Sequence, residues 1–278
     1  MKNLDNNLSR NYKLIIAYDG TKYSGWQRLQ NNIEKSIQGK IEITLSKILD
    51  ENIVIIGSGR TDAGVHAISQ VANFTSNKNI RDLDSFLKDI NHYLPEDIKI
   101  KNISEVNNKF HSRFNARSKI YMYRIDNSQF GDPFIRKFAY FIDPMNNKNN
   151  DYLKLNLENM KKIAEIFIGE HDFTTFSKLR ASSKKEKLKS AIRTISSIDF
   201  KSIGNNNIFE IYFQGDGFLY NMVRMIVGAI ITGGLIADNI KFEIFYSETK
   251  NLLENKSREV QRFVVPPQGL FLYEVLYD

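Results

Sequence analysis

One short segment of this sequence concentrates residue types that can do chemistry. Residues 57–66, Gly-Ser-Gly-Arg-Thr-Asp-Ala-Gly-Val-His, place Arg60 and Asp62 among three glycines. Glycine adopts backbone angles that other residues avoid, and it lets another molecule approach the main chain closely. A carboxylate beside a guanidinium on such a turn is suited to act as an acid, a base or a nucleophile. The simpler alternative is an aspartate that only hydrogen-bonds its own turn.

Several known catalytic and binding motifs are ruled out by the residues present. A P-loop needs Lys and then Ser or Thr after its last glycine, but Val65 and His66 follow Gly64. A dinucleotide-binding loop needs a glycine where Asp62 stands, and no helical pattern opens there. The four histidines show no zinc-binding spacing, and no Gly-x-Ser-x-Gly elbow occurs. No metal site is therefore expected.

Composition and charge favour a soluble protein with a polyanionic partner. The 278 residues carry 39 Lys and Arg against 32 Asp and Glu, a net charge of +7. Such a balance favours nucleic acid, although a lysine-rich composition would produce the same charge without any partner. The absence of cysteine excludes disulfides and a thiol nucleophile and is compatible with a reducing cytoplasm. The polar residues 1–10 predict a loose arm without a signal peptide.

The elements that must position the loop follow a recognisable order. Apolar alternation predicts strands at residues 12–18, 53–56, 67–74 and 98–106, and spacings of three and four predict helices at 33–48 and 83–90. This βαββαβ order is typical of ferredoxin-like domains.

The second half predicts the same order of elements without a residue-level repeat. Strands are expected at residues 120–125, 192–200, 208–213 and 270–277, and helices at 157–167, 219–231 and 242–253. The fold class is therefore α+β, with two ferredoxin-like (RRM-like) βαββαβ domains at residues 11–112 and 113–278 and a central cleft between them.

An arginine stands alone in the most apolar helix. Arg224 is the only charge between Gly217 and Ala237, and the polar and glycine residues around it argue against a membrane span. A buried guanidinium needs a carboxylate or phosphate partner, whereas one that reaches the surface needs none. A lysine-rich loop after Ser177, which includes residues 184–189, is either a solvated run or a phosphate contact.

Several motifs follow one another along nearly the whole chain. Two of them lie in residues 18–27 and 59–67. The others are Phe110-His111-x-Arg113-Phe114, Tyr121-x-Tyr123, His171-Asp172-Phe173, the run from Gly217 to Arg224, and Pro267-x-Gly269-Leu270. In this order, the motifs resemble the signatures of the tRNA pseudouridine synthase A (TruA) family.

The resemblance implies a role for each matched residue. Asp62 would be the catalytic aspartate, and Arg224 would pair with it and keep the carboxylate ionised. Arg60 would enter the RNA and help to displace the target base, and Tyr121 would stack on the flipped uracil. Leu270 would line the pocket, and His66, which closes the loop signature, joins the substrate-binding candidates.

The resemblance also implies the reaction and the partners. The enzyme would convert uridine to pseudouridine at positions 38, 39 and 40 of the tRNA anticodon stem-loop, without cofactor or metal, as a cytoplasmic homodimer. The site of attack by Asp62 is left open between the anomeric carbon and C6 of the ring, with a general-base role as the third possibility. Two alternatives are the same chemistry on another RNA and a non-catalytic RNA-binding protein. An enzyme that uses the carboxylate as a base on a nucleoside is a weaker one.

Overall fold

The computed structural model describes residues 9–143, 155–178, 190–204, 207–255 and 264–278. The chain divides into two compact units. The first contains residues up to Arg117 together with Leu272–Asp278, and the second spans Ser118–Phe271. The sequence predicts a domain boundary after residue 112 and a loose arm over residues 1–10. Residues 1–8 of this arm lie outside the described part of the chain.

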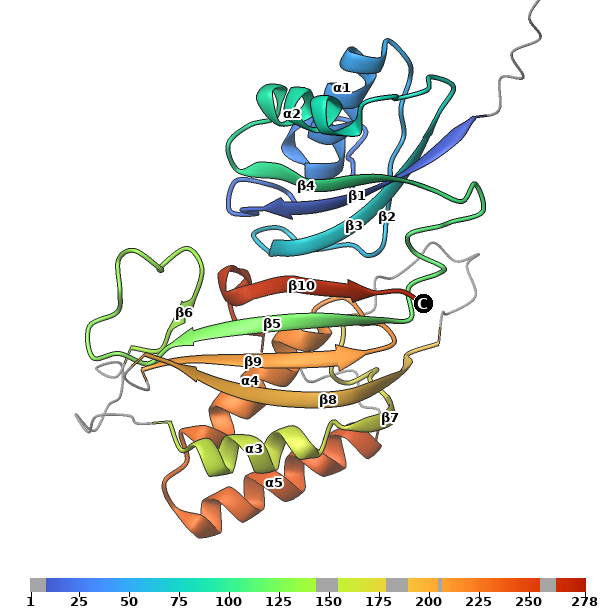
Figure 1. The fold of residues 1–278 in the computed structure, drawn as a ribbon. Coiled ribbons are helices and arrows are strands. Elements are labelled where there is room, and N and C mark those ends of the chain that lie inside the picture. The colour runs from blue at the N-terminus through green and yellow to red at the C-terminus, as the bar shows by residue number, and fades with distance from the viewer. Residues whose placement is uncertain (1–8, 144–154, 179–189, 205–206, 256–263) are drawn as a thin grey trace, which may run out of the picture. The chain divides into compact units, whose positions relative to one another are not determined.

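The first unit has the predicted βαββαβ order (Figure 1). Its strands lie side by side in the order β4-β1-β3-β2, and all neighbouring strands are antiparallel, which is the ferredoxin-like arrangement. Helices α1 and α2 pack on the same side of these strands. The elements are β1 (Arg10–Tyr18), the short helix η1 (Ile33–Lys35), α1 (Ile37–Leu49), β2 (Ile56–Gly57), β3 (His66–Ser76), α2 (Leu83–Tyr93) and β4 (Ile98–Val106).

Simple periodicities build the core of this unit. Alternate residues of β1 are buried, and Ile37, Ile41 and Leu45 of α1, spaced four apart, have no exposed surface. Side-chain oxygens of Ser36 and Asp82 accept backbone N–H groups in the first turns of α1 and α2, which fixes where these helices begin.

Strand β2 is shorter than the apolar run 53–56 predicts. The strand consists only of Ile56 and Gly57. The N–H of Ile53 instead donates to Ser46 Oγ, and that of Ile55 donates to Glu42 Oε1. Because side chains of α1 satisfy these amides, residues 53–55 are partly buried without pairing in the sheet.

The second unit is also α+β, so the predicted fold class is confirmed. Strands β5, β9, β8 and β7 lie side by side and pair antiparallel, β6 pairs parallel with β5, and the three helices contact one another. The elements are β5 (Ser118–Asp126), β6 (Tyr140–Phe141), α3 (Leu157–Glu165), β7 (Gly169–Asp172), β8 (Ile192–Ile203), β9 (Ile208–Gly215), α4 (Met222–Gly234), α5 (Asn239–Glu254), the short helix η2 (Pro267–Gly269) and β10 (Leu270–Leu276), which ends in the first unit.

Helix α4 is the buried helix of the second unit. It begins at Met222 rather than at residue 219, because Asn221 adopts a left-handed conformation with φ of 62°. Close approach of α3 depends on Gly233 and Gly234, where a Cβ would lie 2.6 Å from Ile163 and 2.5 Å from Met160. No helix in the described residues is long and apolar enough to cross a membrane.

Candidate active site

The loop that joins β2 to β3, residues 57–66, carries the predicted catalytic aspartate and is held by buried anchors. Ser58 has no exposed surface, and its hydroxyl donates to Gln70 Oε1 at 2.7 Å. Gln70 Nε2 donates in turn to the carbonyl of Gly59 at 3.0 Å. Gln70 is itself fully buried on β3, so it fixes the first half of the loop from inside the unit.

A second anchor lies directly before Asp62. The hydroxyls of Thr61 and Tyr18 are 2.7 Å apart and buried, and the Thr61 carbonyl accepts the N–H of Trp26 at 3.1 Å. Burial raises the pKa of the Tyr18 phenol well above its ordinary value, and the Thr61 hydrogen bond only partly offsets this. Tyr18 therefore stays neutral over the physiological pH range.

The segment between β1 and α1 packs against this loop at positions where only glycine fits. A Cβ on Gly20 would collide with the carbonyl of Val65, and one on Gly25 would lie 2.5 Å from the carbonyl oxygen of Thr61. The Trp26 indole occupies the equivalent space at Gly57, 2.6 Å from where a Cβ would be. The motif at residues 18–27 therefore forms the surface against which the Asp62 loop packs.

The anchors leave the two chemical groups at the surface. Arg60 is exposed and Asp62 is partly exposed, whereas Ser58, Thr61 and Val65 are buried. The N–H of Val65 donates to the Asp62 carbonyl at 3.1 Å and closes a turn around the aspartate. This arrangement can present a carboxylate to a ligand at a fixed place, as a nucleophile or general base requires.

His66 supports the loop from below. Its ring is fully buried, Nδ1 accepts the N–H of Gly20 at 3.0 Å, and Asp19 Oδ1 lies 3.2 Å from Nδ1. The structure gives His66 a positioning role, and direct contact with substrate stays a prediction.

Tyr18→Phe is expected to lower the free energy of unfolding by about 1–2 kcal/mol at pH 7, because the buried Thr61 hydroxyl loses its partner. The folded pKa of Tyr18 lies above the unfolded value, so its contribution is full below about pH 10 and is lost as the pH rises further. The variant should therefore lose stability less steeply above pH 10. Urea unfolding at pH 7 to 11 measures both effects.

Tyr93→Phe is the matched control, because Tyr93 on α2 is 58% exposed. The Tyr18→Phe variant should still lose some free energy of unfolding at alkaline pH, because burial also raises the pKa of Tyr277. Equal free energies of unfolding for the two variants at pH 7 would contradict the claim that the Tyr18–Thr61 hydrogen bond stabilises the loop.

The other predicted site residues lie in the second unit. Tyr121 on β5 is buried, with its ring edge-on to Phe218 at 5.1 Å between centroids. Leu270 is buried at the start of β10. Arg224 is partly buried on the first turn of α4, where Nε donates to the carbonyl of Val265 at 2.7 Å and Nη1 donates to Asn221 Oδ1 at 3.0 Å.

Arg224 and Tyr123 together fix the segment that leads to Leu270. The Tyr123 hydroxyl donates to the carbonyl of Pro266 at 2.8 Å, next to the Val265 carbonyl bound by Arg224. A Cβ on Gly269 would lie 2.7 Å from the Tyr123 ring, so the chain can pass only with glycine there. Desolvation raises the pKa of Tyr123, and the positive charge of Arg224 partly counters this.

The structure thus groups the predicted residues in two sets. Arg60, Asp62 and His66 share one loop of the first unit, and Tyr121, Arg224 and Leu270 belong to the second. The pairing of Asp62 with Arg224 stays a prediction. The lysine-rich residues 184–189 lie outside the described part of the chain. Among the described residues, no group of three or more His, Cys, Asp or Glu side chains could hold a metal ion.

Five residues support the loop although no sequence pattern predicts a role for them: Tyr18, Gly20, Gly25, Trp26 and Gln70. Tyr18, Gly20, Gly25 and Trp26 lie in the motif at residues 18–27, but sequence periodicity does not indicate which loop this motif contacts. Gln70 carries no such signal, because β3 contains other polar residues, among them Ser69 and Asn73.

A ferredoxin-like domain that presents Asp62 beside an exposed arginine, in a chain of net charge +7, defines the class of protein as a candidate nucleic-acid-modifying enzyme. The model of the family described as tRNA pseudouridine synthase matches residues 14–115 and 163–278. The chain belongs to this family, as its motifs predict.

Similar proteins extend over almost the whole chain. tRNA pseudouridine synthase A of Bacillus sp. (strain KSM-64) is 44% identical over 264 residues, which cover 94% of this chain and 97% of that protein. tRNA pseudouridine synthase A 2 of Bacillus cereus (strain ATCC 14579) is 42% identical, with coverage of 95% and 98%. tRNA pseudouridine synthase A 1 of Clostridium tetani (strain Massachusetts / E88) is 41% identical, with coverage of 96% and 100%.

Proposed function

We propose that this protein converts uridine to pseudouridine at positions 38, 39 and 40 of tRNA, with Asp62 as the attacking group. The observation that carries the proposal is the position of Asp62: partly exposed, on a loop fixed by Ser58 and Thr61, in a chain of the tRNA pseudouridine synthase family. A fixed carboxylate suits attack on a bound nucleoside.

The proposed reaction conserves every atom of the substrate. Asp62 attacks the uridine, the bond from the ribose anomeric carbon to N1 breaks, and the freed uracil turns within the pocket. The anomeric carbon then bonds to C5, and the bond that Asp62 formed breaks and frees the carboxylate. The hydrogen at C5 leaves as a proton, and N1 gains a proton. No oxidant, reductant or energy source takes part, so no cofactor is proposed.

Access to the uridine requires base flipping. A stacked uridine is out of reach of Asp62, and its extrusion costs a few kcal/mol that protein contacts must offset. Arg60 is exposed two residues before Asp62 and is suited to enter the vacated space. Tyr121, buried against Phe218, is the proposed stacking partner of the uracil, and Leu270 lines the same pocket.

Arg224 is the proposed partner of the Asp62 carboxylate. Its contacts with Val265 and Asn221 use two of the five N–H donors of the guanidinium and hold its orientation. A guanidinium with two donors engaged in this way is preorganised for an anion, which supports the pairing. We further propose a cytoplasmic homodimer, in keeping with the family resemblance.

Tritium release tests the proposal directly. Transcribed tRNA labelled with tritium at uridine C5 is incubated with the protein, with no metal or nucleotide added, because formation of the new bond at C5 expels the label. Matched transcripts with cytidine at positions 38, 39 and 40 locate the target. Release that disappears with the cytidines is expected. Release that persists would show another RNA position, and no release from bound tRNA would leave only a binding protein.

Alanine substitution of the lysines in residues 184–189 is expected to weaken tRNA binding and to lower its salt dependence. Each lysine that meets a phosphate should, on removal, reduce the slope of log K against log salt by about one unit, because fewer counterions are released. Filter binding between 50 and 300 mM salt measures the slope. An unchanged slope would identify these lysines as solvated residues without RNA contact.

A further inference from the structure

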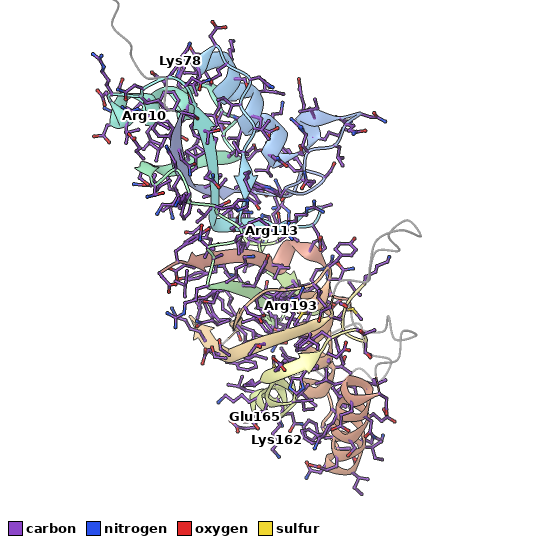
Figure 2. The ribbon with its side chains drawn as sticks, turned by 90° about the vertical axis from the view of Figure 1, so that its right-hand side faces the viewer. Arg10, Lys78, Arg113, Lys162, Glu165 and Arg193 are labelled. Carbon is purple, nitrogen blue, oxygen red and sulfur yellow. The ribbon has the colours of Figure 1, made fainter. Side chains whose placement is uncertain are left out.

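A turn at residues 110–115, which follows β4, presents aromatic and cationic side chains together. Phe114 is 76% exposed, with its ring centroid 4.2 Å from that of His111. Figure 2 labels Arg113 among the side chains. Arg113 is exposed, and its guanidinium carbon lies 5.9 Å from the centroid of the Phe114 ring. An exposed aromatic ring is unfavourable in water, so contact with a ligand that covers the Phe114 ring would be favourable.

Hydrogen bonds within the turn hold these side chains in place. His111 Nδ1 accepts the N–H groups of Arg113 at 3.2 Å and Phe114 at 3.3 Å. Asn115 Oδ1 accepts the N–H of His111 at 2.7 Å. The imidazole thus caps the turn with its proton on Nε2, and the Phe114 ring is presented on a fixed backbone.

Buried polar groups in the core of the first unit support the same turn. Ser112 is fully buried, its N–H donates to Asn73 Oδ1 at 2.9 Å, and its carbonyl accepts the Tyr277 hydroxyl at 2.6 Å. Asn11 Nδ2 donates to the carbonyl of Phe110 at 2.8 Å. Buried amide side chains are unfavourable unless they are paired, and here their partners are the backbone of this turn.

The turn is also tied to the strand that enters the catalytic loop. The Ser112 hydroxyl donates to the carbonyl of Ile56, and Ile56 and Gly57 form β2. The loop that carries Asp62 begins at the next residue. One scaffold within the first unit therefore positions both the aspartate and the exposed Phe114.

We propose that this turn is a second RNA contact, separate from the reacting uridine, in which Phe114 stacks on an unpaired nucleobase and Arg113 meets a neighbouring phosphate. The inference rests on the proposed function, because it takes tRNA as the ligand. Every nucleobase has a face that stacks on an aromatic ring, and an adjacent guanidinium supplies the charge that a phosphate requires. The adjoining arginine and the net charge of +7 favour RNA over a second copy of this cationic chain.

The test measures tRNA affinity in the Asp62→Asn background, where no product forms. Phe114→Ala should weaken binding about 5- to 100-fold, the range found when a stacking aromatic residue is removed. Phe114→Trp should keep the affinity, whereas Phe114→Leu, which is apolar but has no ring, should not. Arg113→Gln should lower the salt slope by about one.

The same unit offers a matched control. Tyr93 on α2 is 58% exposed and has the Lys47 ammonium 5.6 Å from its ring, so it is a second exposed aromatic residue paired with a cation. Tyr93→Ala and Lys47→Gln should leave tRNA affinity unchanged. Thermal unfolding of every variant verifies that the fold is intact.

Parental affinity in Phe114→Ala, or equal affinity of the Leu and Trp variants, would overturn the proposal. So would a change in oligomeric state by sedimentation with tRNA binding unchanged, which would make the turn a contact between copies. Tritium release by the protein with native Asp62 separates the two proposals. Weakened tRNA binding in Phe114→Ala without any release by the native protein would support the contact while refuting the isomerase.

Discussion

Asp62→Asn is expected to abolish pseudouridine formation, with tritium release lowered by at least about 10⁴-fold. An amide has the shape of the carboxylate but lacks the charge that makes it a nucleophile or base, and loss of such a group typically has effects of this size. The backbone of the loop should be unaffected, because Ser58, Thr61 and Gln70 anchor it through buried hydrogen bonds. Affinity for tRNA should therefore change by less than about threefold.

The control for this prediction is the same chemical change elsewhere in the first unit. Asp82 Oδ1 accepts the N–H of Ser85 at the start of α2 at 2.9 Å, and asparagine caps a helix as well as aspartate does. Asp82→Asn should release tritium at the parental rate. Substantial release by Asp62→Asn would show that the carboxylate is not required and would return Asp62 to the role of a turn residue.

Gly25→Ala is expected to lower the free energy of unfolding by roughly 3 kcal/mol, with a fall in melting temperature of about 6–12 °C. Gly25 has a φ of +101°, which a residue with a side chain rarely adopts, and the new methyl would lie 2.5 Å from the Thr61 carbonyl oxygen. Because Thr61 precedes Asp62, the loop must shift to relieve the contact. Tritium release, measured well below the melting temperature, should fall at least tenfold.

Gly204→Ala is the control that distinguishes backbone strain from the collision of the new methyl group with the Thr61 carbonyl. Gly204 also has a positive φ, of +65°, but nothing lies within 4 Å of a Cβ built there. Gly204→Ala should lower the free energy of unfolding by only about 1–2 kcal/mol, which is the penalty for the left-handed conformation itself, and it should leave activity unchanged. Equal losses for the two glycines would show that Gly25 does not hold the Asp62 loop.

The fold is largely predictable from the sequence, because the periodicity of apolar residues predicts most of its helices and strands. The alternation in 12–18 and the four-residue spacing of Ile37, Ile41 and Leu45 place strand β1 and helix α1 within a few residues of their observed limits. The βαββαβ order then leaves few arrangements open, and the ferredoxin-like one is observed. Strand β2 is the exception, because side-chain acceptors on α1 compete with strand pairing, and apolar content cannot reveal them.

The sequence alone determined the family, the candidate Asp62 and the polyanionic class of partner, because residue types and their spacing are properties of the chain itself. Only the tertiary structure decided what holds the aspartate. Tyr18, Gly25 and Trp26 are 31 to 43 positions away from the loop residues they contact, and such contacts follow from how a strand, a turn and a helix pack. The burial of His66 and its contact with Gly20 are likewise visible only in the tertiary structure, and its contact with substrate stays a prediction.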